Sequence, residues 1–242
     1  SFCEELKPGF ALIGEVLFGD YNLIVNDEML HSCTNYECYK GIFSSFNCMN
    51  LFEIAHSLNR QFGPDQWCIY RGKHLMTFVD NHDVTRIASI LTNKNHLPLA
   101  YGLLFGMPGI PCIYYGSEWG EEGVKAPDND YALRPCFEEP KPNELTDFIK
   151  ELIEVRRNSD ALCNGSYRNV VITNHQLIFE RRTDNERVLV AINAGDSEFT
   201  AGNGELQGTF TELLVNTDEA ETVTLNGQLT MPAYSVQFLK AV

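Results

Sequence analysis

An α/β domain built on a parallel sheet, followed by an all-β antiparallel sandwich domain, is the fold that the sequence predicts. Over roughly the first 160 residues, apolar runs alternate with helix-like stretches. Near-continuous apolar strands suit a parallel sheet that is buried on both faces. After Ser159, short apolar runs follow one another between turn signals, which is typical of antiparallel sheets. We therefore expect a first domain over residues 1–162 and a second over 163–242.

Four apolar runs are the predicted strands of the first domain. They are 9–16 (GFALIGEV), 31–37 (HSCTNYE), 75–83 (LMTFVDNHD) and 109–118 (GIPCIYYGSE). The intervals from Glu15 to Asp83 and from Asp83 to Glu118 have room for two strand–helix–strand units and then one. Because the carboxyl ends of parallel strands meet at one rim, we expect these three acids to gather there, together with Asn81 and His82.

Three stretches have the apolar pattern of helices. Residues 52–62 repeat apolar side chains at a spacing of four, 98–107 are apolar around most of the circumference, and 144–159 have one apolar stripe. In the second domain the predicted strands are 165–173, 175–183, 187–195, 208–215 and 235–242. The predicted turns are Thr183-Asp184-Asn185, Gly202-Asn203-Gly204 and Asn226-Gly227.

Composition excludes several classes of function. The chain has 242 residues, is 44% hydrophobic and 21% charged, and has a net charge of -15. This negative charge argues against binding to nucleic acid or to an anionic membrane surface. No apolar run is long enough to span a bilayer. The eight cysteines are scattered without a CxxC pair, so we expect reduced thiols in a cytoplasmic protein rather than a disulfide framework.

Carboxylates that meet at one rim beside a histidine suit sugar chemistry. A glycosidase needs a proton donor for the leaving oxygen and negative charge near an oxocarbenium-like transition state, and it needs no metal for that chemistry. The alternative is that these acids are ordinary helix N-caps; Asp83, for example, could cap a helix that starts near Val84. The coincidence of three acidic strand ends favours a site.

The residues at these strand ends resemble a known family. GEVLFGDYN (14–22) followed by FVDNHD (78–83) resembles two signature regions of the α-amylase superfamily of glycoside hydrolases. GIPCIYYGSEWG (109–120) resembles that family's eighth barrel strand, although the family more often has Gly-Asp-Glu where this chain has Gly116-Ser117-Glu118. NYECYKG (35–41) resembles the cyclomaltodextrinase and neopullulanase branch. The resemblance implies a partial (β/α)8 barrel, about strands five to eight, followed by the family's C-terminal sandwich.

By position, the resemblance implies roles for four rim residues. Glu15 matches the general acid/base, which partial burial would keep protonated until it donates. Asp83 matches the acid that stabilises the transition state, and His82, with Asn81 beside it, matches the group that hydrogen-bonds the sugar hydroxyls.

Asp130 and Arg134 resemble the family's substrate-binding Asp/Arg pair at the same subsite, where a forked guanidinium holds carboxylate and sugar oxygens. A plain surface salt bridge between residues four apart is the alternative. Tyr21, Tyr36 and Trp119 would either stack on sugar rings or, as we favour, pack within the protein.

One catalytic group is missing from the pattern. Retaining cleavage needs a nucleophile, which in this family is an aspartate in a Gly-x-Arg-x-Asp segment at the end of the fourth strand. No Asp precedes Glu15. The resemblance therefore implies the C-terminal half of an enzyme acting on α-glucan oligosaccharides, inactive alone.

Half a barrel has two open edges, so we expect this chain to need an N-terminal half or to self-associate. We expect no cofactor for this chain. Members of the family often bind calcium, so the resemblance allows a calcium ion in the full-length parent protein. The competing interpretation is a non-catalytic carbohydrate-binding or assembly protein on the same fold.

Overall fold

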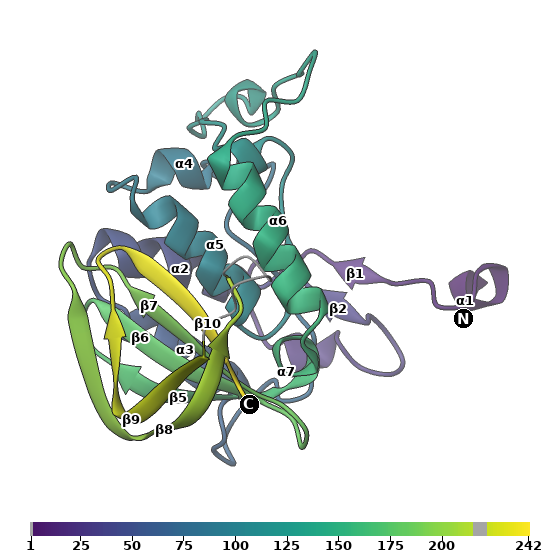
Figure 1. Ribbon diagram of the computed structural model, residues 1–242. Coiled ribbons are helices and arrows are strands. Elements are labelled where there is room, and N and C mark those ends of the chain that lie inside the picture. The colour runs from purple at the N-terminus through teal and green to yellow at the C-terminus, as the bar shows by residue number, and fades with distance from the viewer. Residues whose placement is uncertain (1, 215–221) are drawn as a thin grey trace.

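The computed structural model describes residues 2–214 and 222–242 and shows two domains in contact (Figure 1). The α-helices are α1 (Phe2–Leu6), α2 (Tyr36–Asn47), α3 (Phe52–Phe62), α4 (Ile87–Ile90), α5 (His96–Gly106), α6 (Glu144–Arg157) and α7 (Asp160–Asn164). The 3-10 helices are η1 (Tyr21–Leu23), η2 (Ser117–Trp119) and η3 (Tyr131–Leu133). The strands are β1 (Ile13–Gly14), β2 (Ser32–Cys33), β3 (Met76–Phe78), β4 (Ile110–Cys112), β5 (Ser166–Ile172), β6 (Gln176–Arg182), β7 (Arg187–Asn193), β8 (Phe199–Glu212), β9 (Thr222–Met231) and β10 (Ser235–Ala241).

The first domain contains four parallel strands in chain order. β1 pairs with β2 and β3 pairs with β4, and a parallel bridge between Thr34 and Met76 joins the two pairs. This is the predicted half of a barrel. The strands are shorter than the apolar runs suggested: β1 and β2 have two residues each, and β3 and β4 have three.

The interval between β1 and β2 corrects one expectation. Only the short η1 lies there within the described residues, so the first of the two expected strand–helix–strand units lacks an α-helix. The predicted strand over 31–37 ends at Cys33, and the chain turns into α2, which the sequence patterns had not predicted. The side chain of Asn35 caps α2 by accepting the Cys38 N–H at 3.1 Å. Short polar side chains favour helix N-caps over strand interiors, which explains the early end of β2.

The three predicted helices are confirmed. α3 has the predicted bounds, and α5 is buried on nearly all sides, as its unbroken apolar sequence requires. α6 begins with a capping box, in which Asn143 accepts the Thr146 N–H while the Thr146 hydroxyl accepts the Asn143 N–H.

The second domain is an antiparallel sheet with the strand order β5-β6-β7-β10-β8-β9. Two predicted turns are wrong. Residues 202–204 lie within β8, and Asn226-Gly227 lies within β9, where the two strands shift register between Gly202 and Gln207. Gly227 has a φ of 86°, so its backbone supplies a bend inside a long hairpin rather than the hairpin's end. β9 was not predicted, and the end of the predicted strand 208–215, at Val215, lies outside the described residues.

The two domains share a hydrophobic core. One face of the sheet, with Phe179, Val190 and Phe238, belongs to the same buried cluster as α2, α3 and α5, while the other face encloses a second cluster between β6, β7 and the β8–β9 hairpin. Helix α5 lies close to the sheet because Gly102 and Gly106 have no side chain there. Figure 1 shows the sheet, green to yellow, on the opposite side of the helices from β1 and β2.

No helix among the described residues is both long enough and apolar enough to cross a membrane. All eight cysteines are free thiols, as expected from their scattered spacing.

Candidate active site

The strand ends bring three of the predicted residues together. Glu15 directly follows β1, and His82 and Asp83 follow β3 by a few residues. One polar atom from each of these three side chains lies within 4.8 Å of the others. Parallel strands point their carboxyl ends at one rim, and the described rim therefore holds two carboxylates and an imidazole.

Asp83 is held from several directions. Its Oδ1 accepts a hydrogen bond from the Arg134 guanidinium at 2.8 Å, and its Oδ2 lies 3.3 Å from Nε2 of His82. Arg134 also donates to the carbonyl of His82 at 3.2 Å and to Asp130 at 3.0 Å. Asp130 and Arg134 thus form an ion pair at the surface, and Arg134 also contacts the rim residue Asp83. Lys125, which the sequence did not single out, donates to the Asp83 carbonyl at 2.6 Å.

The helix-capping interpretation of Asp83 is wrong. Helix α4 begins at Ile87, and its first N–H donates to the carboxylate of Asp80 at 2.8 Å. The Ser117 hydroxyl donates to the same carboxylate. Burial raises the pKa of Asp80, while the hydrogen bonds from Ile87 and Ser117 act in the opposite direction. Asp80 therefore caps the helix from inside the protein, and Asp83 remains at the surface.

Arg86 supports the rim from below and was missed by the sequence analysis. Its side chain is fully buried and donates to the Tyr115 carbonyl at 2.6 Å, the Ser117 hydroxyl at 2.9 Å and the Leu133 carbonyl at 2.9 Å. Its guanidinium also lies 4.3 Å from the centre of the Tyr114 ring. Leu133 directly precedes Arg134, so these bonds help to place Arg134 opposite Asp83. An arginine three residues after Asp83 was the available signal.

Tyr36 connects Glu15 to the rest of the rim. Its hydroxyl lies 3.0 Å from Oε1 of Glu15 and accepts a hydrogen bond from Asn81 at 2.9 Å. Burial raises the pKa of Tyr36, so the hydroxyl keeps its proton and can donate it to the carboxylate. Glu15 itself is exposed in this chain, contrary to the expected partial burial. The Asn81 side chain also accepts the Asp83 N–H at 2.8 Å, so it hydrogen-bonds both Tyr36 and Asp83.

The other predicted rim groups lie elsewhere. Glu118 is outside the three-residue cluster, and its Oε2 is buried without a hydrogen-bond partner among the described residues. Its strand end turns into η2, which places Glu118 near Asp80, whose pKa it helps to raise. Tyr21 stacks on Tyr70 and Trp119 packs against Phe137, each with ring centres 5.1 Å apart, so these two aromatics serve packing as we favoured.

A pocket of about 370 Å³ adjoins the cluster on the inner face of the sheet. Its lining residues include Glu15, Asp80, Asn81, His82 and Tyr114. Such a volume lies within the usual range for small-molecule sites, about 300–1,000 Å³. The three clustered side chains also offer ligand atoms to a metal ion, but Arg134 already supplies a positive charge to Asp83. A pocket of this size beside the carboxylates of Glu15 and Asp83 suits a neutral ligand that is rich in hydroxyl groups.

Comparisons with known proteins agree with this arrangement. Residues 31–151 match the family described as the alpha amylase catalytic domain, and residues 169–242 match the alpha amylase C-terminal all-beta domain. The chain belongs to the α-amylase family. The catalytic-domain match contains His82, Asp83, Asp130 and Arg134, whereas Glu15 precedes it.

The related sequences are named as cyclomaltodextrin glucanotransferases or as alpha-amylases. A cyclomaltodextrin glucanotransferase of Bacillus sp. (strain 1-1) is 29% identical over 154 residues, covering 62% of this chain and 22% of the relative. Alpha-amylase 3 of Dictyoglomus thermophilum is 25% identical over 241 residues, covering 83% of this chain and 46% of the relative. The chain therefore spans less than half the length of these relatives.

Solved structures of the α-amylase family share the fold. The alpha-amylase from Geobacillus thermoleovorans, solved in complex with acarbose, superimposes with a TM-score of 0.80 and 19% identity, covering 98% of this chain and 54% of that chain. The cyclomaltodextrin glucanotransferase CldA gives a TM-score of 0.78 at 24% identity, covering 99% and 52%. At these identities the likeness establishes the fold: part of an α-amylase catalytic domain followed by its all-β domain.

Proposed function

We propose that this chain supplies the acid/base half of an active site that cleaves α-glucosidic bonds in maltodextrins with retention of configuration. The observation that carries the proposal is the cluster of Glu15, His82 and Asp83 at the carboxyl ends of β1 and β3. Membership of the α-amylase family supports an enzyme fold that acts on α-glucans.

Each residue has a task in this reaction. Glu15 protonates the leaving oxygen and later deprotonates the attacking water, because in retaining enzymes one carboxyl group serves both steps. Its contact with Tyr36 orients the carboxyl group. Asp83 places negative charge where the sugar ring becomes positive, and Arg134 holds it in position. His82 offers its imidazole to the hydroxyls of the same ring.

The nucleophile must come from outside these 242 residues. In a retaining mechanism the covalent intermediate forms on a second carboxylate about 5–5.5 Å from the acid. Asp83 is already paired with Arg134 and His82, which makes it a stabilising charge rather than a free nucleophile. We propose that a further barrel half, in the same or another polypeptide, supplies the nucleophilic aspartate and completes the barrel next to β1 and β4.

The test compares the chain alone with an active polypeptide that contains it. We expect the purified chain to release no nitrophenol from a nitrophenyl maltoside, and the longer polypeptide to turn it over with a rate that Glu15→Gln abolishes. Turnover by the chain alone that disappears in Glu15→Gln would contradict the assignment of the nucleophile. Normal activity of the longer Glu15→Gln variant would contradict the role of Glu15.

Substrate preference within the family needs a separate measurement. The motif at residues 35–41 favours a cyclomaltodextrinase or neopullulanase, whereas the names of several relatives favour transfer to a sugar acceptor. We propose hydrolysis of maltotriose, pullulan and cyclodextrin. Product analysis on these three substrates separates hydrolysis from transfer: cyclic products from linear maltodextrins would indicate a glucanotransferase instead.

A further inference from the structure

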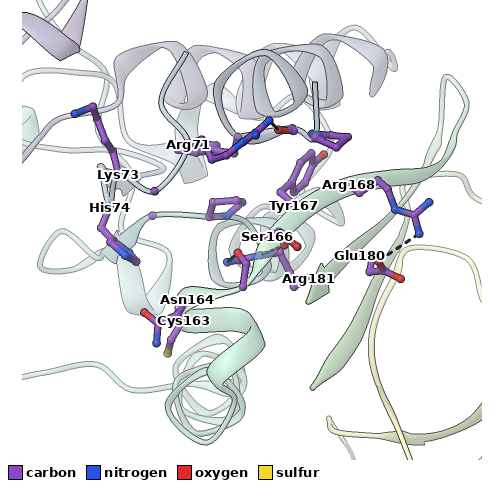
Figure 2. A pocket seen from close by; sticks show the side chains of 17 residues that line it. Arg71, Lys73, His74, Cys163, Asn164, Ser166, Tyr167, Arg168, Glu180 and Arg181 are labelled. Atoms are coloured by element: carbon purple, nitrogen blue, oxygen red, sulfur yellow. Dashed lines mark hydrogen bonds and ion pairs between the residues drawn. The ribbon is translucent and has the colours of Figure 1, made fainter. Parts of the chain in front are cut away.

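A second pocket lies between the two domains, away from the rim (Figure 2). It has a volume of about 450 Å³. The loop from Phe62 to His74, which precedes β3, forms one side, and residues 163–168 with the end of β6 form the other. The pocket therefore lies at the amino ends of the barrel strands, opposite the ends that carry Glu15 and Asp83.

Positive charge is concentrated in this pocket. Its described lining contains Arg71, Lys73, Arg168 and Arg181, against one acid, Glu180. The whole chain, by contrast, has a net charge of -15. The single acid is already engaged: Glu180 pairs with Arg168 at 3.3 Å and with Arg187, which lies outside the pocket, at 2.6 Å.

Three of the cations bond only to backbone carbonyls. Arg71 donates to the carbonyls of Gly63 at 2.9 Å and Asp65 at 2.6 Å, and Lys73 donates to that of Val25 at 2.5 Å. Arg181 likewise donates to three carbonyls, those of Gly106, Gly165 and Ser166. Within residues 2–214 and 222–242, none of these three has a carboxylate at ion-pair distance. Carbonyls satisfy the donors but leave the positive charges uncompensated.

Burial increases the effect of the Arg181 charge, whereas Arg71 is exposed and Lys73 is partly buried. Arg181 is 1% exposed, and the similarly buried Arg156 also donates only to carbonyls, at the C-terminal end of α5. Burial first, and then the neighbouring charge of Arg156, lower the pKa of Arg181 to about 9. An anion in the pocket would relieve this repulsion in a region of low dielectric.

We infer that this pocket binds a phosphate-type oxyanion. Arg71 is the main donor to the ligand, because both of its carbonyl bonds come from one terminal nitrogen, which leaves its other terminal nitrogen and Nε without a partner in the described part of the chain. Arginine suits phosphate because its N–H groups pair with two oxygens at once. The volume exceeds what a single phosphate needs, so there is room for a phosphate attached to a small organic group.

Titration calorimetry of the full chain tests this inference without reference to catalysis. The ligands are inorganic phosphate, glucose 6-phosphate and unphosphorylated glucose, each at an ionic strength held constant with sodium chloride. We expect saturable binding of inorganic phosphate, of glucose 6-phosphate or of both, and none of glucose; tighter binding of the sugar phosphate would identify an organic phosphate as the ligand. No saturable binding of either phosphate compound, or equal binding of glucose, would overturn the inference.

Matched variants locate the binding site. Arg71→Gln should weaken phosphate binding about tenfold or more, as expected for loss of hydrogen bonds to a charged group. Arg157→Gln makes the same change in net charge at an exposed ion pair outside the pocket, and it should leave binding unchanged. Lys73→Gln is the second variant from the pocket. Wild-type affinity in both pocket variants, or an equal loss in Arg157→Gln, would show that the anion binds elsewhere or through net charge alone.

Discussion

Two aspartates only three residues apart have different tasks because one is buried and the other is not. Asp80 lies inside the protein, where its carboxylate accepts hydrogen bonds from Ile87 and Ser117 and closes the first turn of α4. Asp83 lies at the rim, where its partners are the Arg134 guanidinium and the His82 ring. A change at Asp83 should therefore affect chemistry more than folding.

Asp83→Asn tests this separation. In an active polypeptide containing this chain, we expect turnover of maltotriose to fall about a hundredfold, or roughly 3 kcal/mol, the usual loss when one preorganised electrostatic partner is removed. The melting curve should change little, because a partly exposed ion pair such as Asp83–Arg134 contributes less than about 1 kcal/mol. Asp147→Asn, which removes an exposed pair with Lys150 on α6, is the control. A large loss of melting temperature with normal turnover would assign Asp83 to structure.

Tyr36→Phe tests the contact with Glu15. Removing the hydroxyl leaves Glu15 and Asn81 without their shared partner, so we expect turnover to fall about tenfold, the size of one hydrogen bond to a charged group. Tyr21→Phe removes a hydroxyl from a buried ring that packs on Tyr70, and it should leave turnover near normal. The measurement is kcat and KM on maltotriose for both variants; equal effects would remove Tyr36 from the site.

At the scale of single elements, α5 depends on close contact with the sheet. A Cβ atom on Gly102 would lie 2.8 and 2.9 Å from the two Cγ atoms of Val236 and 3.1 Å from its Cβ. Rotation of the valine side chain cannot relieve a contact with its own Cβ. The glycine therefore sets the distance between α5 and β10, and with it the packing of the second domain on the first.

Gly102→Ala should destabilise the protein despite its better helix propensity. Alanine gains about 1 kcal/mol over glycine inside a helix, whereas overpacking a filled core costs about 1–3 kcal/mol. We expect a lower urea midpoint. Gly202→Ala, at a position in β8 where an added Cβ meets nothing within 4 Å, is the matched control. A higher midpoint for Gly102→Ala would contradict the prediction, because it would mean that the contact between α5 and β10 accommodates the added methyl group.

At the scale of the whole molecule, the four-stranded parallel sheet ends in two open edges. β1 and β4 each have one neighbour among the described strands, and Ile13 and Ile110 on them are 48% and 43% exposed. Such edges pair readily with other strands. We expect sedimentation equilibrium at micromolar concentration to show self-association of the chain alone. Ile110→Lys should reduce it, since a charged edge residue disfavours pairing; a stable wild-type monomer would contradict this prediction.

The contact between domains should weaken in acid because of His96. This buried side chain on α5 lies 3.0 Å from the Ala194 carbonyl through Nε2, and burial lowers its pKa. The hydrogen bond to the Ala194 carbonyl acts in the opposite direction, whereas the nearby His175 lowers the pKa further. In the unfolded chain the histidine would titrate near its ordinary value of about 6.5. Below that pH the unfolded chain binds more protons than the folded protein, so stability should fall as pH falls.

Urea unfolding at several pH values between about 7.5 and 5.5 measures this effect. His96→Gln should flatten the pH dependence, because glutamine does not titrate. His56→Gln, at an exposed position on α3, should leave the dependence as in the wild type. The same slope in His96→Gln and wild type would assign the acid sensitivity to other groups.

The local sequence was enough for features that depend on neighbouring residues. The apolar periods of α3, α5 and α6 determine which faces are buried, and the bounds of these helices differ from the predicted ones by two residues at most. The change from apolar runs with polar ends to short apolar runs between turns also indicated that an all-β domain follows the α/β domain. Glu15, His82 and Asp83 could be selected because the ends of parallel strands meet whatever the details of packing.

Tertiary structure alone decided what depends on residues far apart in the chain. The link from Arg134 to Asp83 and the bridge from Asn81 through Tyr36 to Glu15 join groups that no local pattern connects. The Asn-Gly sequences of β8 and β9 do not end a hairpin. They lie inside the two strands, where the register shifts, because cross-strand pairing outweighed the local turn preference. Likewise, the pocket beside Arg71 exists because two domains meet there, and the uncompensated charge of its arginines follows from which partners the fold placed within reach.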